Sequence, residues 1–178
     1  LIVALLISGA VLVTGFNVIL EKTNTLEFCI SCHSMASTVY PEYQQSTHYQ
    51  NRTGIRAECP DCHVPKPFIP KIISKLKASK DIYHTLIGSV DTREKFEAKR
   101  LQMAQRVWDT MKATDSRECR TCHTKSAMVL ALQKPRAQIQ HRNAEQNNET
   151  CIDCHKGITH KPVHQNQEKD EEEADFML

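Results

Sequence analysis

The first twenty residues form an uninterrupted apolar run. The stretch 1–20 contains no charged residue, and Ser8, Thr14 and Asn17 are its only strongly polar positions. Twenty helical residues at a rise of about 1.5 Å span about 30 Å, which is the thickness of a bilayer hydrocarbon core. The pattern therefore predicts one transmembrane helix within residues 1–22.

A cleaved signal peptide is the alternative for this segment. The apolar part of a signal peptide has about 7–15 residues and ends at a cleavage site made of small residues. The run here is longer, and residues 17–22 offer no such site. We therefore expect residues 1–22 to be an uncleaved signal anchor. The chain opens without Met, so we expect a cytoplasmic flank to precede it, and the positive-inside rule cannot set its orientation.

A second apolar pattern runs between residues 66 and 90 and has helical spacing. Its apolar positions are Ile69, Ile72, Ile73, Leu76, Tyr83, Leu86 and Ile87, and its lysines are Lys71, Lys75, Lys77 and Lys80. We expect Pro70 near the start of this helix and Gly88 at its end. A basic amphipathic helix close to a membrane anchor favours a position on the bilayer surface. An ordinary solvated helix face is the alternative.

Three more helical segments follow from the pattern. Asp91 and Glu94 resemble a capping box, and a stripe from Phe96 to Met111 predicts the helix that they start. Residues 124–132 are expected to continue as a helix until Pro135, and a short helix after it is expected to carry His141. The fold class predicted is therefore mainly α, with little strand content.

Composition shows that the polypeptide lacks a core of its own. Only 6% of the 178 residues are aromatic, and Leu, Ile and Val concentrate at the N-terminus. The formal net charge is +2, but six of the 21 acidic residues lie within 168–175, and residues 1–167 carry 15 acidic and 22 basic residues. Residues 165–178 are expected to be a disordered acidic tail. No basic tract is interleaved with aromatic residues, which argues against nucleic-acid binding.

The cysteines indicate that cofactors form the core that the polypeptide lacks. All eight fall into four C-x-x-C-H motifs, and none is left over. The pairs are Cys29 and Cys32, Cys59 and Cys62, Cys119 and Cys122, and Cys151 and Cys154. C-x-x-C-H is the attachment signature of a c-type haem, in which the two thiols bind the porphyrin covalently. Zinc binding and disulfides are the alternatives, but zinc does not require a His after every second Cys.

Four haems would form the missing core, and we expect the haem-free chain not to fold. The motif histidines His33 and His63 lie 30 residues apart, and His123 and His155 lie 32 apart. This near-repeat predicts a tetrahaem domain over residues 23–164, made of two di-haem halves at about 23–90 and 91–164. Four irons offer eight axial positions, and the motif histidines can fill four. The other histidines are His48, His84, His141, His160 and His164.

These motifs resemble the NapC/NirT family of membrane-anchored tetrahaem cytochromes c, most closely its nitrate reductase branch. The likeness runs from the anchor to about Pro162. It rests on E-F-C-I-S-C-H-S-M at 27–35, on 40–48, C-P-D-C-H-V-P at 59–65, S-K-D-I-Y at 79–83, K-F-E-A-x-R-L-x-M-A-Q at 95–105 and C-I-D-C-H-K-G-I at 151–158.

The resemblance implies particular ligands for the four irons. In the family's first motif, C-x-x-C-H-x-M, the methionine binds iron; Met35 holds this position, and His33 is the ligand if the family pattern fails. His63, His123 and His155 would be the other proximal ligands. His48, His141 and His160 match histidines of the family and would be the distal ligands. His84 does not match one, and His164 is interpreted as a tail residue. Spacing does not tell which distal histidine serves which haem.

The resemblance also implies a function. Lys75 and Asp81 match the family's quinol-site residues: the lysine would hydrogen-bond a quinol oxygen, and the carboxylate would accept a proton. The chain would then be a quinol dehydrogenase that passes electrons from menaquinol or ubiquinol to a periplasmic reductase of the nitrate reductase type or to its cytochrome subunit. It would be an electron-transfer protein and not a terminal reductase. Because c-type haem is attached outside the bacterial cytoplasm, the domain is expected in the periplasm, anchored by a single span to the inner membrane. A multihaem reductase acting on nitrite or hydroxylamine at an open haem is the alternative.

Overall fold

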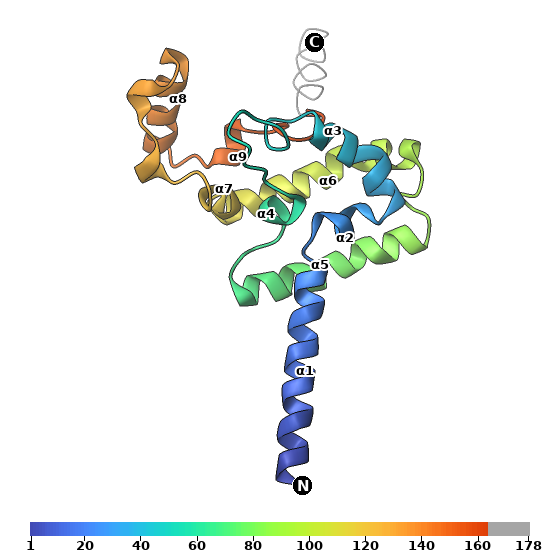
Figure 1. The fold of residues 1–178 in the computed structure, drawn as a ribbon. Helices are drawn as coiled ribbons and strands as arrows, with labels where there is room; N and C mark the ends of the chain where they lie inside the picture. Colours follow the sequence, from blue (N-terminus) through green and yellow to red (C-terminus); the bar gives the residue numbers. More distant parts are fainter. Residues whose placement is uncertain (164–178) are drawn as a thin grey trace.

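The computed structural model describes residues 1–163, and in this range the chain forms helices, turns and loops without a strand. The mainly α fold class is therefore confirmed. Figure 1 shows a single rod, α1 (Ile2–Lys22), projecting from one side of a domain that contains all the other helices. None of the α1 side chains is buried by the rest of the chain, and the helix is long and apolar enough to cross a membrane. The Asn17 amide donates to the Val13 carbonyl oxygen (2.8 Å), which satisfies a polar group inside the apolar run.

Two long helices lie across the domain, as the apolar periodicity predicts. The helix α5 (Phe68–Leu86) crosses the end of α1, and α6 (Arg93–Ala113) runs above it (Figure 1). Gly88 follows α5 with φ +68°, a left-handed conformation that favours glycine and ends the helix. The start of α6 differs from the expected Asp91–Glu94 pair. The Thr92 hydroxyl caps the helix by accepting from the Lys95 amide (3.3 Å), and Asp91 instead pairs with the Lys95 ammonium (2.8 Å).

Four short helices carry the cysteine motifs. They are α2 (Leu26–Ile30), α4 (Cys59–His63), α7 (Arg117–Arg120) and α9 (Cys151–Cys154). Between them lie a π-helical turn, η1 (Met35–Val39), and the helices α3 (Tyr40–Gln44) and α8 (Pro135–Gln146). In Figure 1 α2 lies nearest the end of α1, α4 and α7 lie beside each other farther on, and α9 lies on the far side of the domain.

The expected helix over residues 124–132 is wrong. This segment holds two 3₁₀ turns, η2 (Lys125–Ala127) and η3 (Leu130–Leu132), with extended backbone at Met128 and Val129 between them. The turns are closed by i→i+3 hydrogen bonds, which hold only short helical pieces. The helix that carries His141 begins afterwards at Pro135, as predicted.

The described residues contain very little apolar core. Only Leu26, Tyr43, Phe96 and Ile152 are buried hydrophobic side chains. Many large apolar side chains of the domain are exposed instead, such as Ile55, Val129 and Leu132. The burial of so few side chains does not offset the conformational entropy lost when the chain is ordered. Four large apolar cofactors held among these helices would supply the missing contacts.

The haem-free chain should therefore lack a cooperative fold. Expressed without haem attachment and kept in detergent, it should show the circular dichroism of isolated helices but no cooperative thermal transition. The haem-loaded chain under the same conditions should unfold in a single sigmoidal step. A cooperative transition in the haem-free chain would show that the polypeptide has a sufficient core of its own.

Candidate functional site

Three of the four cysteine motifs share one backbone arrangement. The His123 amide donates to the Cys119 carbonyl oxygen (2.9 Å), and the His155 amide donates to that of Cys151 (2.9 Å). The second motif of the chain, Cys59 to His63, lies wholly within α4. One helical turn places residues three and four apart on the same side. Each of these turns therefore presents two thiols and an imidazole to one side of a short helix.

The first motif is built differently. The helix α2 ends at Ile30, and no backbone hydrogen bond joins His33 to Cys29 in the described chain. Residues 33 and 34 instead lead into η1, which begins at Met35 and whose i→i+5 geometry ends with the Tyr40 amide donating to the Met35 carbonyl. Short π-helical segments occur frequently at functional sites. The His33 side chain is exposed, and Met35 is partly buried.

Local capping holds the motif helices in place. Asp61 and Asp153 close capping boxes at the starts of α4 and α9, accepting from the amides of Glu58 (2.9 Å) and Thr150 (2.8 Å). Ser116, which is fully buried, accepts the Ile152 amide with its hydroxyl oxygen (3.1 Å). This last bond ties the start of the third motif to the fourth motif.

The thiols of successive motifs lie close enough to shift one another's pKa values. A hydrogen bond with Cys59 lowers the pKa of the Cys29 thiol to about 7. Burial raises the pKa of the Cys62 thiol to about 11, with a further contribution from Cys119. Burial also raises the pKa of Cys119, and Cys151 adds to that rise. The first motif therefore neighbours the second, the second the third, and the third the fourth.

Six histidines meet in three pairs. The ring centres are 6.2 Å apart for His48 and His123, 6.2 Å for His63 and His160, and 6.1 Å for His141 and His155. Each pair joins one motif histidine to one of the three expected distal histidines. The angle between the ring planes is 78° in the first pair and 34° and 36° in the other two.

This spacing fits one metal ion between two imidazoles. An imidazole nitrogen binds a metal at about 2.0–2.1 Å, and the ring centre lies about 1.2 Å farther away, so two such rings on opposite sides of an ion have centres about 6.4 Å apart. Burial lowers the pKa of His63 to about 4, with His160 as a further cause. Burial likewise lowers the pKa values of His48 and His160. Neutral imidazole is the form that binds metals.

The described residues do not offer a zinc cluster as an alternative. No group of three or more His, Cys, Asp or Glu side chains lies close enough to hold a metal ion in this part of the chain. A structural zinc site requires about four such ligands. Paired imidazoles beside paired thiols instead match the donor set of bis-histidine c-type haem.

A hydrogen bond behind the ring orients one of the expected distal histidines. The Nδ1 atom of His141 lies 2.6 Å from the Gln133 Oε1 atom, which leaves Nε2 directed away from that contact. A partner of this kind behind a metal ligand fixes its orientation and raises its basicity. The Nδ1 atom of His160 lies 4.0 Å from the Glu42 Oε2 atom, which is too far for a hydrogen bond. The buried Nδ1 atoms of His48 and His160 have no hydrogen-bond partner in the described structure.

Glu42 belongs to a buried ion cluster. The Arg100 guanidinium donates to both Glu42 oxygens (2.8 and 2.9 Å) and to both Glu97 oxygens (2.8 Å each). The Lys161 amide also donates to Glu42 (2.9 Å). Bidentate pairs of this geometry are strong and directional. The cluster therefore joins α3 and α6 to the segment that carries His160.

A glycine allows the chain to return with His160. Gly157 has φ +69°, and a Cβ atom there would lie 2.8 Å from the Pro162 side chain and 3.0 Å from its Cα atom. A side chain at this position would strain the turn after the fourth motif. The small residue therefore lets His160 fold back towards α4.

The two expected quinol-site residues lie on α5 but do not contact each other. The Lys75 ammonium donates to the Thr23 carbonyl oxygen (3.0 Å) and hydroxyl (2.8 Å) at the end of α1. Burial lowers the pKa of Lys75, which the neighbouring Cys29 thiol counteracts. Burial raises the pKa of Asp81, while His84 and Arg106 act in the opposite direction. Lys75 thus lies beside the first motif, whereas Asp81 lies towards α6.

His84 does not join an imidazole pair in the described structure. Its Nδ1 atom is 3.0 Å from the Ser89 hydroxyl, and its ring contacts Tyr83. This environment differs from those of the six paired histidines. His164 lies outside the described residues.

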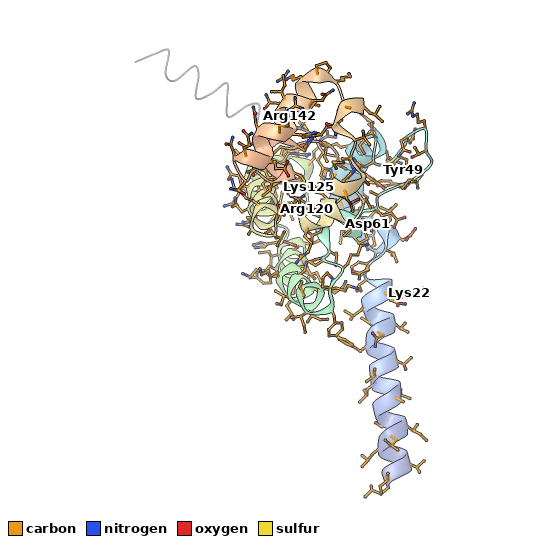
Figure 2. The ribbon with its side chains drawn as sticks, turned by 90° about the vertical axis from the view of Figure 1, so that its left-hand side faces the viewer. Lys22, Tyr49, Asp61, Arg120, Lys125 and Arg142 are labelled. Atoms are coloured by element: carbon orange, nitrogen blue, oxygen red, sulfur yellow. The ribbon has the colours of Figure 1, made fainter. Side chains whose placement is uncertain are left out.

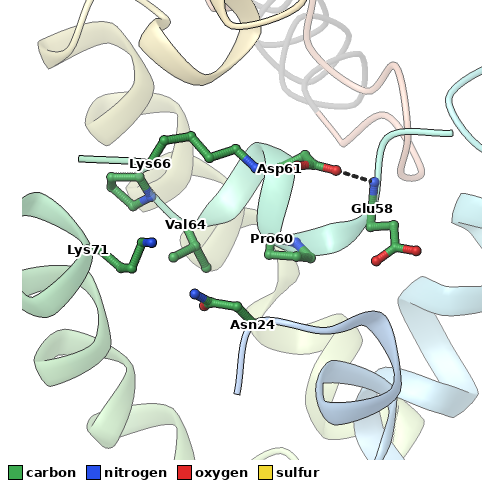
Figure 3. Close-up of a pocket in the computed structure, with 8 residues that line it drawn as sticks. Asn24, Glu58, Pro60, Asp61, Val64, Lys66 and Lys71 are labelled. Atoms are coloured by element: carbon green, nitrogen blue, oxygen red, sulfur yellow. Dashed lines mark hydrogen bonds and ion pairs between the residues drawn. The ribbon is translucent and has the colours of Figure 1, made fainter. Parts of the chain in front are cut away.

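Two pockets lie beside the second motif and beside His160. The pocket in Figure 3 has a volume of about 170 Å³ and is walled by the charged side chains of Glu58, Asp61, Lys66 and Lys71 together with Asn24. Lys75 and Asp81 do not line it. A second pocket of about 340 Å³ is lined by Glu42, His160 and their neighbours.

Sequence reasoning missed Gln133, Glu42 and Arg100. An Arg three residues after Glu97 was a signal for a helical ion pair. The contact with Glu42 joins residues 58 positions apart, and no sequence spacing indicates it. The same is true of the contact between Gln133 and His141, which depends on the turns before α8.

Paired thiols and paired imidazoles on a helical frame are the haem-attachment residues and iron ligands of a c-type cytochrome with several haems. The helix α1 is long and apolar enough to anchor this frame in a membrane. The chain is therefore a membrane-anchored multihaem cytochrome of the c type.

It belongs to the NapC/NirT cytochrome c family, whose N-terminal region model matches residues 1–165. It is 52% identical over 167 residues to the denitrification system component NirT of Stutzerimonas stutzeri, covering 94% of this chain and 83% of the relative. It is 56% identical over 155 residues to the cytochrome c-type protein NapC of Escherichia coli K12, covering 87% and 78%. A tetraheme cytochrome c-type protein of Allochromatium vinosum is 47% identical over 154 residues, covering 86% and 83%. No solved structure matches the chain.

Proposed function

We propose that this protein is a quinol dehydrogenase that passes electrons from the membrane quinol pool to a periplasmic reductase of the nitrate reductase type. The haem domain lies on the periplasmic side of the bacterial inner membrane. The relatives named NapC and NirT support this assignment. The observation that carries it is the order of the motif helices, because the first and unusual motif lies nearest α1 and the others lead away from it (Figure 1).

Four covalently bound haems c are held by the eight cysteines and, when bound, carry single electrons. The imidazole pairs support an assignment of axial ligands that spacing alone left open. His160 serves the second motif with His63, His48 serves the third with His123, and His141 serves the fourth with His155.

The first motif supplies Met35 as its axial ligand. The helical turn that brings the motif histidine beside its cysteines elsewhere is absent at His33. Met35 is partly buried at the start of the π-helical turn. A thioether ligand raises the reduction potential relative to imidazole, which suits the position where electrons enter.

The quinol binds between α5 and the first motif. Lys75 lies beside Cys29 and has a pKa lowered by burial, so its ammonium is a desolvated hydrogen-bond donor for a quinol oxygen. Asp81 accepts a proton as the quinol is oxidised, because its raised pKa makes it a stronger base than an ordinary aspartate. Each quinol releases two protons and two electrons. Asp81 would take up a proton, and haems held by the eight cysteines would supply the acceptors for the electrons.

The oxidised protein should give two kinds of low-spin electron paramagnetic resonance signal. Imidazole planes close to perpendicular give a signal with a very large highest g value, and planes closer to parallel give a rhombic signal. The 78° pair should produce the first kind and the two other pairs the second. His48→Met should remove only the large-g signal, and His84→Ala should change nothing. Survival of that signal in H48M would refute the pairing.

Substitutions at Met35 and His33 should show which of the two residues binds the iron of the first haem. Met35→His should lower the reduction potential of the first haem, because imidazole replaces a thioether. His33→Gln should leave the spin state as it is in the wild type. Magnetic circular dichroism and a redox titration measure both quantities. If H33Q alone alters the first haem, His33 is the ligand.

Quinol oxidation should depend on Asp81. In liposomes containing the full haem-loaded chain, Asp81→Asn should lower the rate of haem reduction by a menaquinol analogue by about 10²-fold or more. Asp109→Asn, which changes an exposed carboxylate on α6, is the matched control. The base is active only when deprotonated, so the wild-type rate should fall as pH drops through the raised pKa of Asp81, and this limb should be absent in D81N.

The same preparation tests the overall function. The reduced protein should stay reduced when nitrite or hydroxylamine is added, and it should reoxidise when a periplasmic nitrate reductase is supplied. Turnover of nitrite without a partner, together with slow reduction by quinol, would make the protein a terminal reductase instead.

A further inference from the structure

The outer face of α5 exposes apolar side chains. On this helix and the residue after it, Phe68, Ile69, Ile73, Leu76, Ile82, Tyr83, Leu86 and Ile87 are each between 47% and 81% exposed. Residues 69, 73, 76, 83 and 87 recur at three-, four- and seven-residue steps, which places them along one stripe of a helix. A surface helix of a soluble domain normally turns such a stripe inward.

The side of α5 that faces the protein carries polar groups. Lys75 donates to Thr23. Ser74, Lys75 and Ile72 are partly buried, whereas the neighbouring Ile73 and Leu76 are exposed. The helix therefore turns Ser74 and Lys75 towards the protein and leaves most of its large apolar side chains exposed.

The position of α5 relative to α1 identifies what faces this stripe. The Lys75 ammonium binds both the carbonyl oxygen and the hydroxyl of Thr23, the residue that follows α1. Figure 1 shows α5 running across the end of α1, on the side of the domain from which α1 projects. The helix α5, which carries the apolar stripe, thus lies at the level where α1 ends.

Lysines within and beside the stripe point to the same occupant. Lys77 and Lys80 are exposed on α5, in addition to Lys71 and Lys75 nearer the protein. Lysines extend long aliphatic stems along an apolar surface and place their ammonium groups in a polar layer. An anionic lipid headgroup beside acyl chains offers both partners at once.

We propose that α5 is an interfacial helix embedded in the bilayer that α1 crosses, with its apolar stripe on the acyl chains and with Lys77 and Lys80 on anionic phosphates. The domain is thereby held flat against the membrane by two elements, a crossing helix and a surface helix. This inference rests on the membrane anchor alone and does not require quinol oxidation.

Photo-crosslinking in nanodiscs tests the proposal on the full haem-loaded chain. Benzoylphenylalanine is placed at Leu76, and in a separate variant at Ile139, an exposed apolar residue of α8 (51%). After irradiation in nanodiscs of phosphatidylcholine and phosphatidylglycerol, mass spectrometry should detect phospholipid adducts at position 76 in at least tenfold excess over position 139. An unchanged haem spectrum verifies that each variant is folded.

The lysines are tested in the same preparation. The double variant Lys77→Gln and Lys80→Gln should lose at least half of the yield of adduct at position 76 in anionic nanodiscs, and it should match the parent in pure phosphatidylcholine. Equal adduct yields at positions 76 and 139, or crosslinking of position 76 to a second copy of the chain, would overturn the proposal. The crosslinking readout involves no electron transfer. The proposed quinol oxidation can therefore be refuted while the membrane contact of α5 is confirmed, and the membrane contact can be refuted while quinol oxidation is confirmed.

Discussion

Three imidazole pairs with ring centres about 6 Å apart are the constraint on which this structure depends. They bring together histidines that are 75, 97 and 14 residues apart in the chain. Only four apolar side chains are buried in the described domain, so hydrophobic packing of the polypeptide does not explain this convergence. Iron between the rings, within a large apolar porphyrin, would explain it and would supply the core at the same time.

Two of these pairs cross between the expected halves of the domain. His48 of the first half faces His123 of the second, and His160 of the second half faces His63 of the first. Each half thus contributes an imidazole to a motif of the other, and the Glu42–Arg100 cluster crosses in the same way. Figure 2 shows the rest of the domain gathered beyond the end of α1, where Lys22 is labelled. A division at about residue 90 stays a prediction, as does the tail over 165–178, which lies outside the described residues.

The chemistry of the site was predictable because it is local in sequence. Four C-x-x-C-H motifs, the anchor and the two long amphipathic helices follow from spacing and periodicity, and the structure contains the corresponding helices. The partner of each motif histidine was not predictable, because it depends on the path of loops between helices. Residues 124–132 were misjudged for a related reason: their apolar side chains Val129 and Leu132 are exposed in the described chain, so no packing of a helical face holds the segment in one helix. Gln133 contacts His141, and Glu42 lies near His160. Sequence spacing carries no signal for either neighbour.

The first motif shows how a shared signature can be put to a different use. Its cysteines match the others, but a π-helical turn and an open chain at His33 replace the closed helical turn. This departure lies next to α1 and to Lys75, where a membrane-dissolved substrate would arrive. The three regular motifs lie farther from the anchor, in an order suited to carrying charge away from it.

An anomalous difference map recorded at the iron absorption edge tests this account most directly. The account predicts four iron peaks for the haem-loaded chain. Three should lie midway between the rings of the His48–His123, His63–His160 and His141–His155 pairs, and the fourth should lie beside Met35. Iron peaks away from these midpoints, or an iron bound by a different combination of histidines, would contradict it.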